Sequence, residues 1–430
     1  MLDIAFLVAG VGISGGTNTI LEHAANIAQL GNRVTLVTLN KCSPSALAWH
    51  PNAQHLATLG VRVIHIDEVG KRAFDVAIAT FWATVFHMWK INSESYLYYV
   101  QSIESRFPSE DEVDLKLLID STYEMGLGLI TVASWMTRYL QQVHGQTASL
   151  ALNGIRKDIF NAGVRPTQVR PQNGPRLLVE GPFDVAFKNV PNTLAACRDA
   201  GFQDVWLVTN DRIDPTVGGV GRVFQHVPMA QMNEIYGSCD VLVKLSLVEG
   251  MFGPPLEMFH CGGTAVVFDV TGHDEYIKDG VNGIVVQTGN YSRVSDALRK
   301  LRSRPEILQR LQMNALRTAS EWPDWQQSSA CFMNSIEDAR GRATVTQSQL
   351  RNICWRLWAL FQTGRRLRAE EREKSQAAAC TSRSLEVAAH TARNIEAEIL
   401  DAVYRSNSWR MTSPLRAIMR SIYKVTGRAG

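Results

Sequence analysis

The sequence has few of the features that cross-link secreted domains or anchor a chain in a membrane. Its seven cysteines are odd in number and include no Cys-x-x-Cys pair. We therefore expect neither a disulfide framework nor a structural zinc site, and a reducing cytoplasm fits best. No run of about 18 apolar residues occurs, so no transmembrane helix is expected. Residues 1–10 are apolar but lack a basic leader, which predicts a first strand rather than a signal peptide.

The chain also has little excess of one charge sign over the other. The net charge is only +3 over 430 residues, which gives no reason to expect nucleic acid as a partner. The excess is unevenly placed, because residues 341–430 hold 16 Lys/Arg and 7 Asp/Glu whereas residues 1–340 hold 28 and 34. No Asp-x-Asp follows a predicted strand and no His/Cys cluster is present. We therefore expect no metal and no other cofactor.

What the chain does have is a regular alternation of apolar runs with helical patterns. Its length predicts two to three domains, and 45% hydrophobic residues can bury two large cores. In residues 1–165 the runs predict seven strands separated by helices, which is typical of a parallel sheet with helices on both faces. The predicted strands are Ile4–Ala9, Arg33–Leu39, Val61–Ile66, Asp75–Ala79, Tyr96–Val100, Leu129–Ala133 and Ser149–Leu152.

A second set of alternating elements follows a linker. Residues 162–175 are rich in Pro, Gly, Gln and Asn, and their apolar residues follow neither the period of a helix nor that of a strand, which is typical of a linker. The elements expected after it include strands from Arg176 and over Val205–Thr209, and helices over Met229–Ser238 and Tyr291–Leu311. We therefore expect an α/β chain with Rossmann-like domains at 1–165 and 166–340 and a helical, basic tail at 341–430.

One strand-loop-helix-strand unit organises the second half. Apart from Lys244, Val241–Leu245 is an apolar run with the length of a buried parallel strand. A Gly/Pro-rich turn, a short helix over Pro255–His260 and a second apolar strand over Thr264–Phe268 follow it. Two carboxylates, Glu249 and Glu257, bracket the turn.

The geometry of such a unit gives the turn a function. In open parallel sheets, ligands lie beyond the carboxyl ends of the strands, where a helix N-terminus also presents free N–H groups. An anion such as a diphosphate would bind the amides of Met251, Phe252 and Gly253. Glu249 and Glu257 would repel phosphate and suit hydroxyls, which a nucleotide sugar offers on both sides of its diphosphate.

These residues resemble the signature of glycosyltransferase family 4, whose members are retaining enzymes with the GT-B fold. The resemblance rests on Glu249 and Glu257 with seven residues between them, the Gly-rich filling and the Pro-Leu-Glu-Met continuation. It implies that Glu249 contacts the transferred sugar and Glu257 the nucleotide ribose. It also implies that the helix opened at Trp322-Pro-Asp-Trp325 crosses back toward the first domain. The alternative to a binding role is that Glu249 and Glu257 simply flank a helix and contact only water.

The glycines after the first strand allow two interpretations. Gly10-Val-Gly-Ile-Ser-Gly15 matches the dinucleotide fingerprint formally, but the second strand ends Leu39-Asn40 without the acidic residue that binds the ribose. We reject an NAD site on that ground. Gly15 and Gly16 instead resemble the glycine loop of GT-B enzymes, which faces the interdomain cleft and lets substrate approach the backbone.

The segment after the fifth predicted strand indicates which members of the family this chain resembles most. Its Gln-x-x-Glu-x-x-Phe form, with Gln101 and Glu104, is similar to polysaccharide rhamnosyltransferases of the rhamnan-synthesis type. This implies that both side chains face the cleft and bind the transferred sugar or the acceptor. A loop in which Glu104 is simply solvated is the alternative.

The phosphate site departs from the family pattern. Family members carry an Arg and then a Lys after the first strand of the second domain, and Lys188 fits the Lys while no Arg stands near Pro182. The site is one cation short unless Lys244, or an arginine from the other domain, compensates. The resemblance also places the segment around Val227 beside the nucleobase.

The tail has its own patterns. Residues 350–361 are aromatic and amphipathic, and a short heptad seam runs over 385–402. Residues 408–424 mix apolar and cationic side chains without an acid, which fits either an anionic membrane surface or a protein partner. The tail resembles endings of polysaccharide-assembly proteins, so peripheral attachment to the inner face of the plasma membrane is expected.

Together these features favour a metal-independent hexosyltransferase. We expect it to move rhamnose or mannose from a nucleotide diphosphate sugar to a cell-surface polysaccharide or lipid-linked glycan. Two alternatives stay open, a nucleotide-sugar epimerase and a non-catalytic scaffold of a polysaccharide-assembly complex.

Overall fold

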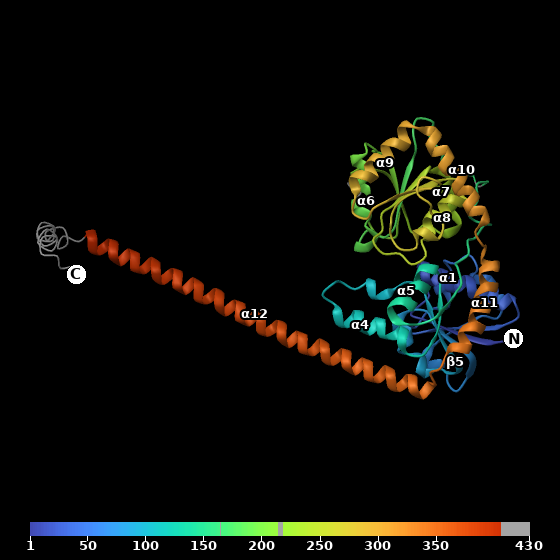
Figure 1. The fold of residues 1–430 in the computed structure, drawn as a ribbon, viewed down its shortest axis with the longest axis horizontal. Coiled ribbons are helices and arrows are strands. Elements are labelled where there is room, and N and C mark those ends of the chain that lie inside the picture. The colour runs from blue at the N-terminus through green and yellow to red at the C-terminus, as the bar shows by residue number, and fades with distance from the viewer. Residues whose placement is uncertain (164, 214–217, 406–430) are drawn as a thin grey trace, which may run out of the picture. The chain divides into compact units, whose positions relative to one another are not determined.

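The computed structural model describes residues 1–163, 165–213 and 218–405. Its contacts divide the chain into two compact units, residues 1–358 and residues 359–430. The first unit contains two parallel sheets (Figure 1). We call the first sheet with its helices lobe 1 and the second sheet with its helices lobe 2.

Lobe 1 is built on seven parallel strands in the order β3-β2-β1-β4-β5-β6-β7. They are β1 (Asp3–Val8), β2 (Arg33–Thr38), β3 (Arg62–His65), β4 (Ala73–Ala79), β5 (Asn92–Val100), β6 (Gly128–Thr131) and β7 (Ala148–Leu150). The helices between them are α1 (Gly15–Gln29), α2 (Ala53–Thr58), α3 (Trp82–Val85), α4 (Val113–Ser121) and α5 (Ser134–His144). All seven predicted strands are present, and only the start of β5 lies more than two residues from its predicted place.

Lobe 2 has six parallel strands in the order β10-β9-β8-β11-β12-β13. They are β8 (Leu177–Glu180), β9 (Val205–Thr209), β10 (Val220–Gln225), β11 (Val241–Lys244), β12 (Thr264–Phe268) and β13 (Ile284–Val286). Its helices are α6 (Val190–Asp199), α7 (Met229–Ser238), α8 (Gly253–His260), α9 (Tyr291–Ser303) and α10 (Pro305–Glu321). The single helix predicted over Tyr291–Leu311 is wrong, because the chain breaks at Arg304 and restarts at Pro305, whose missing N–H suits a first helical residue.

The sheet of lobe 2 has an apolar core on each face. Leu178 and Leu242 point into a cluster with α7, α8 and α10, while the adjacent Leu177 and Val241 point into a cluster with α6 and α9. Successive side chains of a strand face opposite sides, so a strand buried on both faces must be apolar throughout. This explains why the first three residues of β11, from Val241 to Val243, are all apolar.

The chain crosses between the lobes twice. The second crossing leads into α11 (Trp325–Arg342), which packs on lobe 1 against α1, β5, β6 and β7, as predicted. Trp322 donates its indole N–H to the Asn153 carbonyl of the first crossing at 2.9 Å. A Cβ on Gly154 would lie 2.5 Å from the Asp324 backbone, so the two crossings pass each other closely.

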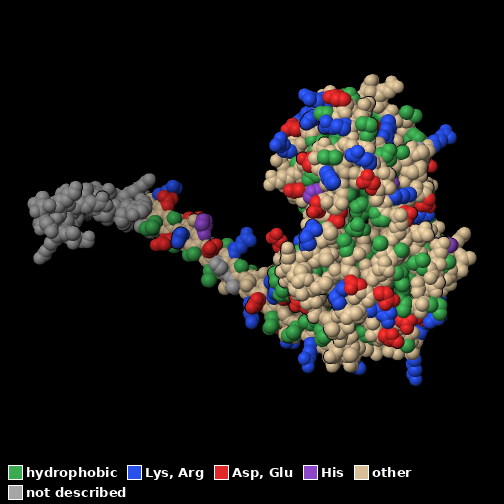
Figure 2. All heavy atoms as spheres, turned by 45° about the vertical axis from the view of Figure 1, so that its right-hand side comes forward, with side chains coloured by type: hydrophobic (Ala, Val, Ile, Leu, Met, Phe, Trp, Pro, Cys, Tyr) green, Lys and Arg blue, Asp and Glu red, His purple; other side chains and the backbone are tan. Residues whose placement is uncertain are grey.

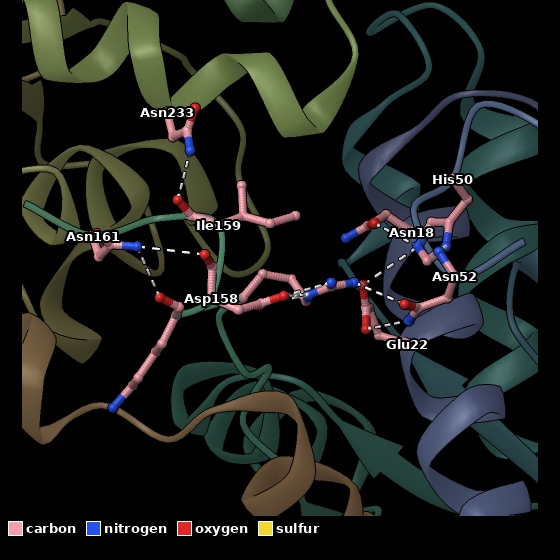
Figure 3. Close-up of polar contacts among 10 residues, drawn as sticks. Asn18, Glu22, His50, Asn52, Asp158, Ile159, Asn161 and Asn233 are labelled. Atoms are coloured by element: carbon pink, nitrogen blue, oxygen red, sulfur yellow. Dashed lines mark hydrogen bonds and ion pairs between the residues drawn. The ribbon is translucent and has the colours of Figure 1, made fainter. Parts of the chain in front are cut away.

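The first crossing is fixed to both lobes (Figure 3). Arg156 donates to the Glu22 carboxylate at 3.2 Å and to the Asn52 side chain at 2.9 Å, both on lobe 1. On the other side, Asn233 of α7 donates to the Ile159 carbonyl at 2.8 Å. An open cavity of about 310 Å³ lies beside Arg156 and contains none of the predicted site residues.

The final described helix, α12 (Gln347–Arg405), begins within the first unit. Leu350 and Cys354 are buried there, and Gln347 donates to the Trp89 carbonyl at 3.0 Å. In the second unit the predicted heptad positions Leu385 and Ile399 lie on the exposed surface of the helix. No helix in the described part of the chain is long and apolar enough to span a membrane. The amphipathic segment predicted over residues 408–424 lies outside the described residues.

Candidate active site

The loop between β11 and α8 contains Glu249 and is the centre of the site. We call residues 245–252 the central loop. It lies at the carboxyl end of β11, where ligands bind in open parallel sheets. The predicted strand-loop-helix-strand unit is present, with α8 starting at Gly253 rather than Pro255.

Gly250 brings the central loop against lobe 1. Its carbonyl accepts a hydrogen bond from the Trp135 indole at 2.9 Å. A Cβ at position 250 would lie 2.1 Å from the Gln101 carbonyl oxygen and would collide with it. Only glycine therefore allows the two backbones this approach, which places Glu249 next to the contact between the lobes.

Both lysines predicted for the phosphate are already paired with carboxylates. Lys188 Nζ lies 2.9 Å from Glu249 Oε1, and Lys244 Nζ lies 2.5 Å from Glu180 Oε2. Lys244 is only 3% exposed, and such burial alone would lower the pKa of its ammonium. The carboxylates of Glu180, Glu249 and Glu257 outweigh burial, so the pKa of Lys244 is raised and the group is charged.

Glu257 lies on α8, which follows the central loop. Its carboxylate accepts a hydrogen bond from the Tyr236 hydroxyl at 3.0 Å. Burial raises the pKa of Glu257 from 4.5 to about 7, against the lowering effect of that hydrogen bond. The group therefore changes charge near neutral pH, unlike an ordinary surface glutamate.

The start of α8 offers fewer amide donors than predicted. Pro254 and Pro255 have no N–H, and the Gly253 amide already donates to the Met251 carbonyl at 3.1 Å. Phe252 is fully buried, and its carbonyl accepts a hydrogen bond from the Tyr276 hydroxyl. The expectation of a free Gly253 amide is thus corrected. A binding role for the amides of Met251 and Phe252 stays a prediction.

The predicted residues of lobe 1 lie together at the ends of β1 and β5. Gly15 and Gly16 begin α1, and Ser14 caps it by accepting from the Thr17 amide at 3.0 Å. A Cβ on Gly16 would lie 3.4 Å from Gln101 Oε1, so the Gln101 side chain packs directly over this glycine. Gln101 and Gly16 therefore form one surface, next to the contact with Gly250.

Glu104 does not lie where the sequence predicts. Its side chain is only 2% exposed and points into lobe 1 instead of toward the other lobe. The carboxylate accepts hydrogen bonds from the Trp82 amide at 2.6 Å and from the Tyr98 hydroxyl at 2.9 Å. Burial raises the pKa of Glu104 to about 8, more than these bonds lower it. Its position is that of a residue that holds the loop after β5.

Val227, predicted to lie beside a nucleobase, precedes α7. It is partly buried and packs against the apolar cluster that also contains Tyr236 and Leu256. The backbone just before it is unusual, because His226 has a φ of 51°. Val227 and Glu257 thus lie around the same cluster.

Two residues around this site were not predicted from the sequence. Glu180, the partner of Lys244, ends β8, and Tyr236, the partner of Glu257, lies on α7. A signal existed for Glu180, because it is a charged residue at the end of an apolar strand, as Lys244 is. No sequence signal distinguishes Tyr236 from a core tyrosine.

Comparisons with known proteins bear on the fold. Residues 220–318, which include Glu249 and Glu257, match the family model described as glycosyl transferases group 1. No curated protein matches the chain. Similar solved structures include sucrose-phosphate synthase from Thermosynechococcus elongatus, with a TM-score of 0.60 and 15% identity over 79% of this chain and 99% of that chain.

Two further solved structures are equally similar in fold. HepE from Anabaena, in complex with UDP-glucose, has a TM-score of 0.61 at 13% identity, over 79% of this chain and all of the other. TarM from S. aureus has a TM-score of 0.61 at 9% identity, over 78% and 99%. The fold is therefore GT-B, and residues 220–318 are similar to the glycosyl transferases of group 1.

Proposed function

We propose that this protein is a retaining glycosyltransferase that moves a hexose or deoxyhexose from a nucleotide diphosphate sugar to a glycan. The observation that carries this function is that Glu249 in the central loop and Glu257 on α8 both lie close enough to Lys244 to raise the pKa of its ammonium, while Lys188 pairs with Glu249. Carboxylates suit the hydroxyls of a sugar and a ribose, and the lysines suit the phosphates between them. Rhamnose and mannose are the sugars that the sequence resemblance favours.

Each side of the donor has a binding group in this arrangement. Glu249 would hold the transferred sugar and Glu257 the ribose, while Val227 would lie beside the nucleobase. The diphosphate would be bound by Lys188, Lys244 and backbone amides of the central loop. Gln101, together with Gly15 and Gly16, would contact the transferred sugar or the acceptor from lobe 1.

The main requirement of the reaction is to stabilise the leaving group. The bond between the anomeric carbon and the diphosphate oxygen breaks, and a bond from an acceptor hydroxyl forms on the same face of the sugar. Negative charge grows on the departing diphosphate, and prepositioned cations and N–H groups stabilise it without reorganising. No metal is needed for this step if the lysines carry that charge.

Relatives support a nucleotide sugar as donor and a glycan as acceptor. The HepE structures hold UDP-glucose, or UDP and glucose. The TarM structure holds UDP, alpha-GlcNAc-glycerol and Fondaparinux. For this chain we propose a cell-surface polysaccharide or lipid-linked glycan as acceptor. Attachment to the inner membrane face through residues 341–430 would bring the enzyme to it.

A non-catalytic scaffold is the second candidate. It is favoured by the ion pairs of Lys188 and Lys244, since both cations already have carboxylate partners. A scaffold of a polysaccharide-assembly complex would use the tail and would not release nucleoside diphosphate. Donor-dependent release of that product therefore separates the two candidates.

The test begins with a thermal-shift screen of UDP, dTDP and GDP and their sugars. A ligand at 100 times its Kd adds about 2.7 kcal/mol of stability, which is readily seen. The donor found is then used with Glu249→Ala, which should abolish transfer without weakening nucleoside diphosphate binding, because it frees Lys188. The exposed Glu306→Ala is the control. Transfer by Glu249→Ala at the parent rate would refute the role of Glu249.

A further inference from the structure

The charges of the proposed phosphate site do not favour a diphosphate as they stand. Lys188 and Lys244 are each paired with a glutamate, and Glu257 adds a third carboxylate. Lobe 2 therefore offers two cations against two carboxylates and one more that is half ionised near pH 7. A bound diphosphate needs surplus positive charge in a preorganised position. A cation from another part of the chain would supply this surplus.

Arg106 of lobe 1 lies at the right place. Its guanidinium stacks over the rings of Trp135 and Tyr139, with Cζ 5.1 Å from each ring centroid. Its Nη1 is 3.4 Å from the Thr271 hydroxyl of lobe 2, and that hydroxyl donates to the Glu249 carbonyl at 3.2 Å. One side chain therefore separates the Arg106 guanidinium from the backbone of Glu249.

The residue after Arg106 makes a second contact with the same site. The ring of Phe107 stacks on the ring of Phe187, with centroids 5.3 Å apart and planes 15° apart. Phe187 directly precedes Lys188, the cation that pairs with Glu249. The end of the loop after β5 thus contacts lobe 2 at Thr271, which bonds to the Glu249 backbone, and at Phe187, which precedes Lys188.

Arg106 also has no counter-ion in the part of the chain that the structure describes. Its polar contact is with a neutral hydroxyl, and its other partners are aromatic rings. Arg138, another lobe 1 arginine that reaches lobe 2, differs because it pairs with Asp274 at 3.6 Å. A guanidinium held by two ring faces and not neutralised is ready to bind an anion, and its planar fork suits phosphate oxygens.

We propose that Arg106 is the donor-phosphate ligand that lobe 2 lacks and that lobe 1 supplies. This rests on the proposed function, since it assigns the phosphates of the same donor. It makes phosphate binding depend on contact between the lobes, because lysines and arginine come from opposite sides. The donor then stabilises the closed arrangement in which transfer occurs.

The test compares Arg106→Ala with Arg138→Ala by titration calorimetry. Each variant is titrated with whichever of UDP, dTDP or GDP the parent binds most tightly, and with the corresponding nucleoside. Loss of a charged hydrogen bond predicts a 10- to 100-fold weaker diphosphate affinity for Arg106→Ala and less than a twofold change for the nucleoside. Arg138→Ala should stay within twofold for both ligands, and Arg106→Lys should fall between parent and Arg106→Ala.

The outcomes separate this inference from the proposed function. Equal diphosphate affinity of parent and Arg106→Ala overturns the role of Arg106 and leaves the proposed function intact. An equal loss for nucleoside and diphosphate also overturns it, because Arg106 then only holds the lobes together. A parent protein that binds none of the three diphosphates refutes the proposed function and this inference with it.

Discussion

Replacing Glu104 by glutamine should make the protein more stable, and increasingly so as the pH rises. Glu104 is 2% exposed, and its hydrogen-bond donors are the neutral Trp82 amide and Tyr98 hydroxyl. A glutamine oxygen can accept both bonds, and the amide carries no charge to bury. The ionised carboxylate, by contrast, must leave water for a site without a cation among the described residues.

The size of the effect follows from the pKa. Burial raises the pKa of Glu104 from 4.5 to about 8 in the folded protein. Between those values the folded state binds a proton that the unfolded state has released, so stability falls as pH rises. Each pH unit removes at most about 1.4 kcal/mol, or about 3 kcal/mol from pH 5 to pH 7. Glu104→Gln is free of this loss.

The assay is thermal unfolding of parent and Glu104→Gln from pH 5 to pH 8.5. At about 2–4 °C per kcal/mol for a domain of this size, the Tm gap should widen by about 6–12 °C between pH 5 and pH 7. Glu110→Gln, an exposed neighbour, is the control and should show a constant gap. A gap for Glu104→Gln that does not change with pH would refute the placement of a neutral carboxyl inside lobe 1.

Three more changes probe other parts of the structure. Arg156→Ala should lower stability by about 2–3 kcal/mol, measured as a fall in Tm, because the buried Glu22 carboxylate loses its guanidinium and, among the described residues, keeps only Asn52 and His50 as partners. Affinity for the nucleoside, which has no phosphate for a carboxylate to repel, should rise with pH through about 7 as Glu257 ionises and accepts ribose hydroxyls, and calorimetry should find no such rise in Glu257→Gln. Gly250→Ala should slow transfer about 100-fold in a steady-state assay, because its Cβ would lie 2.1 Å from the Gln101 carbonyl and push the lobes apart.

Sequence patterns were sufficient for the sheets because the strands are buried on both faces. Runs such as Thr264–Phe268, which carry no charged residue, have few other uses in a chain of this length, and glycines or prolines mark the ends of several of them. The helix break at Arg304 is not visible in the apolar period, which continues through it. Pro305 is the local signal for the break, because the residue before a proline disfavours the helical conformation.

Side-chain directions in the loops could not be predicted in this way. Glu104 follows a strand but lies in a short turn, where neither the period of a strand nor that of a helix applies. Its buried position depends on Tyr98, which a sequence pattern places in the core without showing that its hydroxyl needs a partner. The pairing of Glu180 with Lys244 likewise depends on β8 and β11 being neighbours, although 60 residues separate these strands in the chain.

The same pairings bear on how a donor would enter the site. On the face drawn in Figure 2, acidic and basic side chains are interspersed over both lobes. Inside the site, the Lys188–Glu249 pair likewise places a positive charge next to a negative one. A diphosphate that binds Lys188 competes with Glu249, and a sugar hydroxyl that binds Glu249 competes with Lys188. A nucleotide sugar replaces both partners at once, whereas a nucleoside diphosphate leaves Glu249 without a partner. If Lys188 and Glu249 have the proposed roles, their ion pair would favour the intact donor over the product and so aid product release.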